Sequence, residues 1–361
     1  MRRVIVLGSS GSIGTQALDV IRRNADRFEL VGLATGSQAG LLAEQAAEFG
    51  VAHTALGADE AAHLVRDVEA DVVLNGITGS VGLGPTLAAL EAGRTLALAN
   101  KESLIVGGDL VRGLAAPGQI VPVDSEHSAI AQSLRAGRAE EVRRLVVTAS
   151  GGPFRGRTRA ELADVTPAEA LRHPNFAMGR VITTNSATLV NKGLEVIEAH
   201  LLFDVPYDAI DVVVHPQQMI HSMVEFRDGS TIAQAGPPRM LVPIALGLSW
   251  PERLGDVDEP IDWSSAQEWR FEPLDDDAFP AVRLARQVGE AARTFPAVYN
   301  AANEQAVDAF HEGRIRFTDI VDTVAAVVDR HDAPAELTLD ALAEAEGWAR
   351  RTADQLISGA R

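Results

Sequence analysis

Cysteine is absent from this 361-residue chain, and lysine is almost absent. Without cysteine the chain has no disulfide, no thiolate metal ligand and no cysteine nucleophile, an absence that fits a cytoplasmic protein. Only two of the 32 basic residues are lysines, Lys101 and Lys192, and each follows an asparagine. Lysine is a compact charge on a flexible stem, whereas arginine carries a bulky planar fork. We therefore expect both lysines in a phosphate or sugar site; a chance remainder is the alternative.

Long apolar runs are also missing, as is an excess of positive charge. No stretch approaches the roughly 18 apolar residues of a membrane span, so no membrane partner is expected. Fifty acidic residues against 32 basic ones give a formal net charge of −18, which argues against nucleic acid as a partner. With 46% hydrophobic residues, a chain of this length is expected to form two or three well-packed domains.

Glycines punctuate the first 35 residues in a pattern typical of nucleotide binding. Residues 3–7 predict a buried strand, residues 8–14 form a G-x-x-G-x-x-G loop, and residues 15–24 predict a helix. A second strand is expected at 29–34, which completes a βαβ unit. Glycines let a pyrophosphate approach the backbone, and a helix N-terminus offers free N–H groups. A purely structural turn is the alternative.

The end of the second predicted strand bears on the choice of cofactor. NAD-binding proteins usually carry an acidic residue there, which holds the ribose hydroxyls. Residues 34–38 read Ala-Thr-Gly-Ser-Gln and contain no acid, which favours NADP. Strands and helices go on alternating up to residue 98, and ligands of such sheets lie at the carboxyl ends of the strands. Lys101 follows the strand predicted at 95–98.

Carboxylates gather in the middle of the chain. We expect residues 121–126 to be extended, so that Asp124 and Glu126 share a face. Converging carboxylates without cysteine suit a hard cation, Mg²⁺ or Mn²⁺. A helix from the polar cap at 185–188 to about residue 200 places Asn191, Lys192 and Glu195 on one face. A solvated strand edge and a routine surface ion pair are the respective alternatives.

Two further segments predict ligand contacts. A strand at 145–149 runs into Ser150-Gly151-Gly152, whose N–H groups and hydroxyl suit a phosphate or oxyanion. Residues 172–180 lack any helical or strand period and predict a loop of the kind that closes over a site.

Eight stretches of this chain resemble the 1-deoxy-D-xylulose-5-phosphate reductoisomerase family. They are GSSGSIG (8–14), LANKES (98–103), PVDSEHSAI (122–130), SGGPF (150–154), RHPNFAMGR (172–180), NSATLVNKGLEVIEA (185–199), HPQQMIHSMVEF (215–226) and NAANEQAV (300–307). VDSEH together with NKGLE is the most specific part. The resemblance implies rearrangement of 1-deoxy-D-xylulose 5-phosphate by retro-aldol cleavage and re-addition, followed by NADPH reduction to 2-C-methyl-D-erythritol 4-phosphate.

The resemblance also implies residue roles. Residues that would hold NADPH are Ser10, Gly11, Ser12, Ile13, Gly36, Ser37, Gln38, Asn100, Glu102 and Gly179. One Mg²⁺ or Mn²⁺ would be bound by Asp124, Glu126 and Glu195. The ketone and hydroxyl end of the small phosphorylated sugar would contact Lys101, Ser125 and Glu126. Its phosphate end would contact Ser150, His173, Ser186, Asn191 and Lys192. Catalytic roles would fall to Lys101, Glu126 and His173.

The expected fold is α/β in four stretches. A Rossmann-like NADP-binding domain is expected at 1–122, a central α+β catalytic domain at 123–246, a linker at 247–278 and a small helical domain at 279–361. Strands near 212–214, 223–226 and 231–234 predict an exposed sheet whose edge pairs in a homodimer. Rival functions are an NAD(P)-dependent dehydrogenase of another phosphorylated substrate and a non-catalytic nucleotide-binding protein.

Overall fold

The computed structural model describes residues 1–172 and 179–359. Packing divides the chain into two units. The first comprises Met1–Leu104, Leu110–Arg135 and Arg239–Asp262, and the second comprises Ile105–Asp109, Ala136–Pro238 and Trp263–Arg361. Within the described ranges, no helix combines the length and apolar character that a membrane crossing requires.

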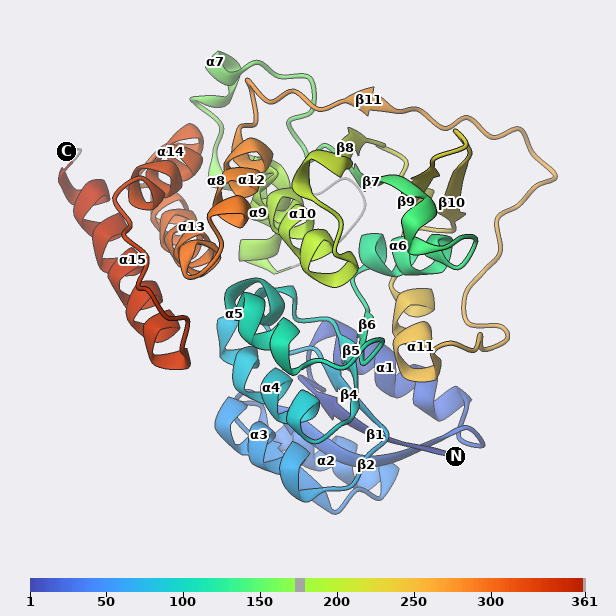
Figure 1. Ribbon diagram of the computed structural model, residues 1–361. Coiled ribbons are helices and arrows are strands. Elements are labelled where there is room, and N and C mark those ends of the chain that lie inside the picture. The colour runs from blue at the N-terminus through green and yellow to red at the C-terminus, as the bar shows by residue number, and fades with distance from the viewer. Residues whose placement is uncertain (173–178, 360–361) are drawn as a thin grey trace. The chain divides into compact units, whose positions relative to one another are not determined.

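The first unit is built on a six-stranded parallel sheet in the order β3-β2-β1-β4-β5-β6 (Figure 1). Its strands are β1 (Arg2–Leu7), β2 (Phe28–Thr35), β3 (His53–Leu56), β4 (Val72–Asn75), β5 (Thr95–Leu98) and β6 (Ile120–Pro122). The strand order reverses on either side of β1, and the carboxyl end of such a strand is where open α/β sheets bind ligands. The predicted Rossmann-like sheet is confirmed.

The first unit also contains helices, most of which pack against these strands. They are α1 (Ser12–Arg23), α2 (Ala39–Phe49), α3 (Ala58–Asp67), α4 (Leu83–Glu91), α5 (Lys101–Leu114, kinked at Gly108), α6 (Ser125–Leu134) and α11 (Leu241–Ser249). One apolar cluster joins Val4 and Val6 of β1 with Leu18 and Ile21 of α1 and Ile244 of α11. The sequence-based boundary at 246 therefore falls inside α11, and residues 247–249 are helical rather than linker.

The second unit contains a five-stranded mixed sheet in the order β10-β9-β7-β8-β11 (Figure 1). Its strands are β7 (Val142–Ala149), β8 (Ile210–Val214), β9 (Ile220–Phe226), β10 (Thr231–Ala235) and β11 (Glu272–Pro273). Strands β7 and β8 are parallel, whereas β9, β10 and β11 pair antiparallel to their neighbours. The three strands predicted between 212 and 234 are confirmed.

The helices of the second unit fall into two groups. The first group lies between β7 and β8 in the chain and comprises α7 (Arg159–Leu162), α8 (Pro167–Ala170), α9 (Arg180–Thr188) and α10 (Val190–Phe203). The chain ends in α12 (Ala281–Ala291), α13 (Phe295–His311), α14 (Phe317–Val328) and α15 (Leu339–Gly359). Helices α14 and α15 both pack against α13, which is buried along most of its length, and this confirms the predicted C-terminal helical region. Short 3₁₀ turns cover Ser80–Gly82, Ala139–Glu141 and Tyr207–Ala209.

Candidate active site

The glycine loop after β1 forms a tight cradle at the carboxyl end of the sheet. Gly8 has a φ of 76°, and a Cβ there would lie 2.5 Å from the carbonyl oxygen of Gly76. A Cβ on Gly14 would lie 2.2 Å from the carbonyl oxygen of Gly8, so side chains are excluded at both positions. Helix α1 begins at Ser12 with no side-chain cap, which leaves its first N–H groups available to an anion.

The short connection 36–38 lies beside this cradle. Strand β2 ends at Thr35 and α2 begins at Ala39, so Gly36, Ser37 and Gln38 occupy the carboxyl end of the strand next to β1. All three are exposed, and a Cβ on Gly36 would meet nothing within 4 Å. The segment thus offers polar side chains and open backbone beside the glycine loop.

Asn100 fixes the start of α5. Its Oδ1 accepts a hydrogen bond from the backbone N–H of Ser103 at 2.8 Å, and its Nδ2 donates to the carbonyl oxygen of Gly79 at 2.8 Å. A Cβ on Gly82 would lie 2.8 Å from Asn100 Oδ1, so glycine is needed at 82 for this fit. The N-cap thereby sets the positions of the next two residues, Lys101 and Glu102.

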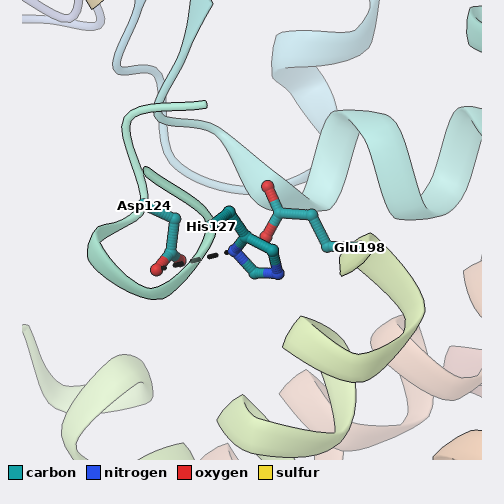
Figure 2. Close-up of side chains that lie close together, drawn as sticks. All are labelled: Asp124, His127 and Glu198. Atoms are coloured by element: carbon teal, nitrogen blue, oxygen red, sulfur yellow. Dashed lines mark ion pairs between the residues drawn. The ribbon is translucent and has the colours of Figure 1, made fainter. Parts of the chain in front are cut away.

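Lys101 forms an ion pair with Asp124, the residue that precedes α6. The Nδ1 of buried His127 lies 3.8 Å from Asp124 Oδ1 (Figure 2). Burial alone would raise the pKa of the Asp124 carboxyl, but the Lys101 charge and the His127 hydrogen bond hold it well below its usual range. Asp124 is therefore an ionised oxygen donor.

Glu126 is in the first turn of α6, where its carboxylate accepts a hydrogen bond from Ser125 Oγ at 2.6 Å. The expectation that residues 121–126 form one extended segment was wrong, because α6 begins at Ser125. Asp124 is the N-cap residue of this helix, with φ −54° and ψ 134°. Within this unit Lys101 nevertheless pairs with Asp124, and Ser125 pairs with Glu126 in the next two positions.

In the second unit, residues 150–152 follow β7 as a left-handed turn. Gly151 and Gly152 have φ values of 83° and 66°, and the Gly152 N–H donates to Ser150 Oγ at 3.1 Å. A Cβ on Gly152 would lie 2.8 Å from the carbonyl oxygen of Ser186. The glycines therefore let the Ser150 turn pack directly on the end of α9, next to Ser186.

One polar stripe lies on α10. Asn191 Nδ2 donates to Glu195 Oε1 at 2.5 Å, and Lys192 forms an ion pair with Glu195 Oε2. Lys192 and Glu195 are 4% and 1% exposed, so the solvated surface pair is ruled out. The predicted helix to about residue 200 is present as α10, but the prediction that 185–188 cap it was wrong, because these residues lie in α9 and Leu189, with a φ of 61°, separates the two helices.

Helix α13 supports α9 through residues to which the sequence gave no role. Asn303 Nδ2 donates to Asn185 Oδ1 at 2.9 Å, and Thr184 Oγ1 shares a hydrogen bond of 2.8 Å with His311 Nε2. Asn303 lies in the matched stretch NAANEQAV, which was the available signal. His221, in another matched stretch, is also buried; burial lowers its pKa and the nearby Lys192 charge acts in the same direction.

Of two predicted residues in the segment 172–180, one is described and one is not. His173 lies outside the described residues. Gly179 precedes α9 as its N-cap residue, and its carbonyl oxygen accepts a hydrogen bond from Thr183 Oγ1 at 2.9 Å.

Comparison with known protein families gives a consistent result along the chain. A model of 1-deoxy-D-xylulose 5-phosphate reductoisomerase matches residues 4–67 and 51–108. Models of the C-terminal domain of the same enzyme match residues 120–203 and 235–352. The matched segments together cover most of the chain.

Individual relatives are similar over their full length. The 1-deoxy-D-xylulose 5-phosphate reductoisomerase of Leifsonia xyli is 69% identical over 357 residues, covering 99% of each chain. That of Paenarthrobacter aurescens is 57% identical over 390 residues, again covering 99% of each chain. A solved structure of the Zymomonas mobilis enzyme in complex with NADPH has a TM-score of 0.92 and 38% identity, covering 99% of each chain.

A second solved structure is of a reductoisomerase in complex with NADPH, fosmidomycin and magnesium. It has a TM-score of 0.92 and 34% identity, and covers 99% of this chain and 98% of its own. Identity at these levels over whole chains, together with the matching family models, settles the assignment. The chain belongs to the 1-deoxy-D-xylulose 5-phosphate reductoisomerase family.

Proposed function

We propose that this chain converts 1-deoxy-D-xylulose 5-phosphate into 2-C-methyl-D-erythritol 4-phosphate, a step of non-mevalonate isoprenoid precursor biosynthesis. The observation that carries the proposal is 69% identity, over 99% of both chains, to a protein named for this activity. The described residues that the family resemblance singled out are consistent with it in type and in local geometry.

NADPH supplies the hydride that reduces the rearranged aldehyde. The N–H groups of Ser12 and Ile13 are free of side-chain caps and suit its pyrophosphate, and Ser10 and Gly11 complete that loop. At 36–38 there is no carboxylate to repel a 2′-phosphate, and Ser37 and Gln38 would contact it. Residues assigned to the nicotinamide half are Asn100, Glu102 and Gly179.

A divalent cation, Mg²⁺ or Mn²⁺, supplies Lewis acidity at the substrate's ketone and hydroxyl oxygens. We assign it to Asp124, Glu126 and Glu195, because ionised carboxylate oxygens are the donors that hard cations prefer. The ionised state of Asp124 and the burial of both glutamates support this donor set.

The chain's own side chains orient the substrate. Lys101 and Ser125 would hold its ketone and hydroxyl end beside Glu126, and His173 would contact its phosphate end. Ser150, Ser186, Asn191 and Lys192 would hold the phosphate, in support of which Ser150 and Ser186 lie on adjoining segments. Phosphate binding away from the reacting carbons supplies orientation without taking part in bond changes.

Product structure separates this function from its rivals. With substrate labelled at the methyl-bearing carbons, NMR of the product should show the branched skeleton of 2-C-methylerythritol phosphate. An unbranched reduced sugar phosphate would support the hypothesis of an NAD(P)-dependent dehydrogenase. NADPH binding without any product would support the hypothesis of a non-catalytic nucleotide-binding protein.

We also propose that the active form is a homodimer joined through β10. This strand is an edge of the five-stranded sheet, and its first three residues, Thr231–Ala233, are exposed. An unpaired strand edge carrying an exposed Ile232 is suited to pair with the same edge of a second copy. Light scattering should give twice the chain mass, and Ile232→Lys should halve it; a monomer in the wild type would contradict the proposal.

We also propose that the protein is located in the cytoplasm. The absence of cysteine and the cytosolic supply of NADPH support it. Fractionation of cells that express the tagged chain should place it with cytoplasmic markers, and recovery with the envelope would contradict this.

A further inference from the structure

A buried glutamine holds the glycine loop from behind. Gln45 lies in α2 and is 7% exposed, and Ser9 is fully buried. Gln45 Oε1 accepts a hydrogen bond from Ser9 Oγ at 2.7 Å, and Nε2 donates to the Ser9 carbonyl oxygen at 3.0 Å. A carbonyl only accepts, so the orientation of the amide is fixed by its chemistry. Both polar atoms of Gln45 therefore bind a single residue.

These two bonds make Ser9 the fixed point of the loop. Its backbone N–H donates to the carbonyl oxygen of Ala34 at 2.9 Å, so its N–H, carbonyl and hydroxyl are all bonded within the protein. On its two sides stand Gly8, held by the same Ala34 oxygen at 2.8 Å, and Ser10, whose hydroxyl bonds that of Thr35. The cap-free N–H groups at Ser12 and Ile13 follow three and four residues later.

Helix α2 links Ser9 to the turn 36–38, the second segment assigned to the cofactor. The helix begins at Ala39, immediately after Gly36–Gln38, and reaches Gln45 less than two turns later. A displacement of Gln45 would therefore move both the loop 8–14 and the turn 36–38. A site whose donors are set before the ligand arrives binds more tightly, since no ordering has to accompany binding.

We propose that Gln45 is a positioning residue for NADPH, which acts by locking Ser9 and not by contact with the cofactor. The inference rests on the cofactor site proposed above. Through Gln45, helix α2 would raise the affinity for NADPH. It would take no part in the rearrangement or in metal binding.

The test measures NADPH affinity directly, by calorimetry on the full chain without metal or substrate. Gln45→Leu keeps the volume of the side chain and removes both hydrogen bonds, so NADPH should bind on the order of tenfold more weakly. Gln45→Glu keeps the acceptor shape but turns a carboxylate toward the Ser9 carbonyl, and should bind at least as weakly. In turnover assays the KM for NADPH should rise while kcat and the KM for the sugar phosphate stay near wild type.

Gln119→Leu is the matched control. Gln119 is in the same unit, just before β6, where its Nε2 donates to the carbonyl oxygens of Leu90 and Arg94 at 3.0 Å and its Oε1 accepts from the Ala116 N–H at 2.8 Å. Its loss removes three hydrogen bonds, one more than Gln45→Leu removes, at the amino end of the strands. It should lower the melting temperature but leave NADPH affinity unchanged.

Ser9→Ala tests the same contact from its other side, in case a Gln45 variant does not fold. It keeps the Nε2–carbonyl bond and loses only the hydroxyl, so NADPH should bind about two- to threefold more weakly. Combined with Gln45→Leu it should add little, because both changes break one contact. Wild-type affinity in Gln45→Leu or Ser9→Ala, or equal weakening in Gln119→Leu, overturns the inference. A wild-type chain that does not bind NADPH overturns the proposed function instead.

Discussion

Lys101 and Asp124 form an ion pair whose side chains are only 14% and 11% exposed. Lys192 and Glu195 form a second, more deeply buried pair in α10. Each of the chain's two lysines thus faces a carboxylate assigned to the metal. A buried carboxylate needs a neighbouring positive charge, which the ammonium group supplies in each unit. The placement of both lysines is therefore explained by one requirement.

Glu195→Gln keeps the shape of the side chain and removes its charge. We expect metal-dependent activity to fall on the order of 100-fold or more, since loss of a partner in a metal's surroundings alone costs 10- to 100-fold. NADPH affinity, measured by calorimetry, should not change. The control Glu312→Gln removes an exposed carboxylate that pairs with Arg314 at 2.6 Å and should be silent. Wild-type turnover at limiting Mn²⁺ would remove Glu195 from the metal site.

Lys192→Arg keeps the charge but enlarges a side chain that is 5% exposed. The guanidinium should crowd the phosphate pocket and raise the KM for 1-deoxy-D-xylulose 5-phosphate on the order of tenfold. Steady-state kinetics at saturating NADPH and metal measures this. As the reverse exchange on the surface, Arg159→Lys at the Arg159–Asp322 pair should leave KM unchanged. A silent Lys192→Arg would mean that the pocket does not select against arginine.

Asn303→Leu tests the support of α9 by α13. The change leaves Asn185 Oδ1 without its buried donor and should cost about 1–3 kcal/mol of stability. Because Ser186 follows Asn185, the KM for the sugar phosphate should rise while NADPH affinity stays constant. Gln305→Leu, which breaks a 2.9 Å bond from the same helix to Asp354, should lower stability without the rise in KM. Equal kinetic effects of both changes would contradict a specific support of α9.

The C-terminal helices should lose stability in acid through His331. Its Nε2 shares a 2.8 Å hydrogen bond with buried Thr294, and burial lowers its pKa from 6.5, with the Asp332 charge opposing. The folded state therefore binds the proton less readily than the unfolded state. Stability should be full above about pH 6.5 and decline as the pH falls below it. His331→Gln should flatten this decline in urea titrations; an unchanged pH dependence would exclude His331 as its source.

Local patterns foretold most of the fold. The glycine loop and the alternation up to residue 98 predicted the parallel sheet because strand, turn and helix there follow from neighbouring residues. Helix ends were less accessible: α6 begins at Ser125, inside the segment expected to be extended, and Leu189 separates α9 from α10. A φ of 61° at a leucine has no sequence signature.

The contacts of the site likewise divide into those that local spacing predicts and those that depend on the fold. Asn191, Lys192 and Glu195 are linked at helical spacing, so their pairing was predictable. The pairing of Lys101 with Asp124 joins the first residue of α5 to the residue that precedes α6 and needed the sheet to be known. Gln45 acts across a long sequence separation and carries no catalytic side-chain chemistry, so no local pattern could have singled it out. Asn303 also acts at long separation, and its one signal was the matched stretch 300–307.

The central claim is tested most directly by NADPH oxidation, followed by its ultraviolet absorbance, with 1-deoxy-D-xylulose 5-phosphate as substrate. The assay is run with Mg²⁺, with Mn²⁺, with EDTA, and again with NADH. We predict rapid oxidation of NADPH that requires the metal, is abolished by EDTA, and is much slower with NADH. Turnover that is unaffected by EDTA, or no turnover with any metal while NADPH still binds, would contradict the account.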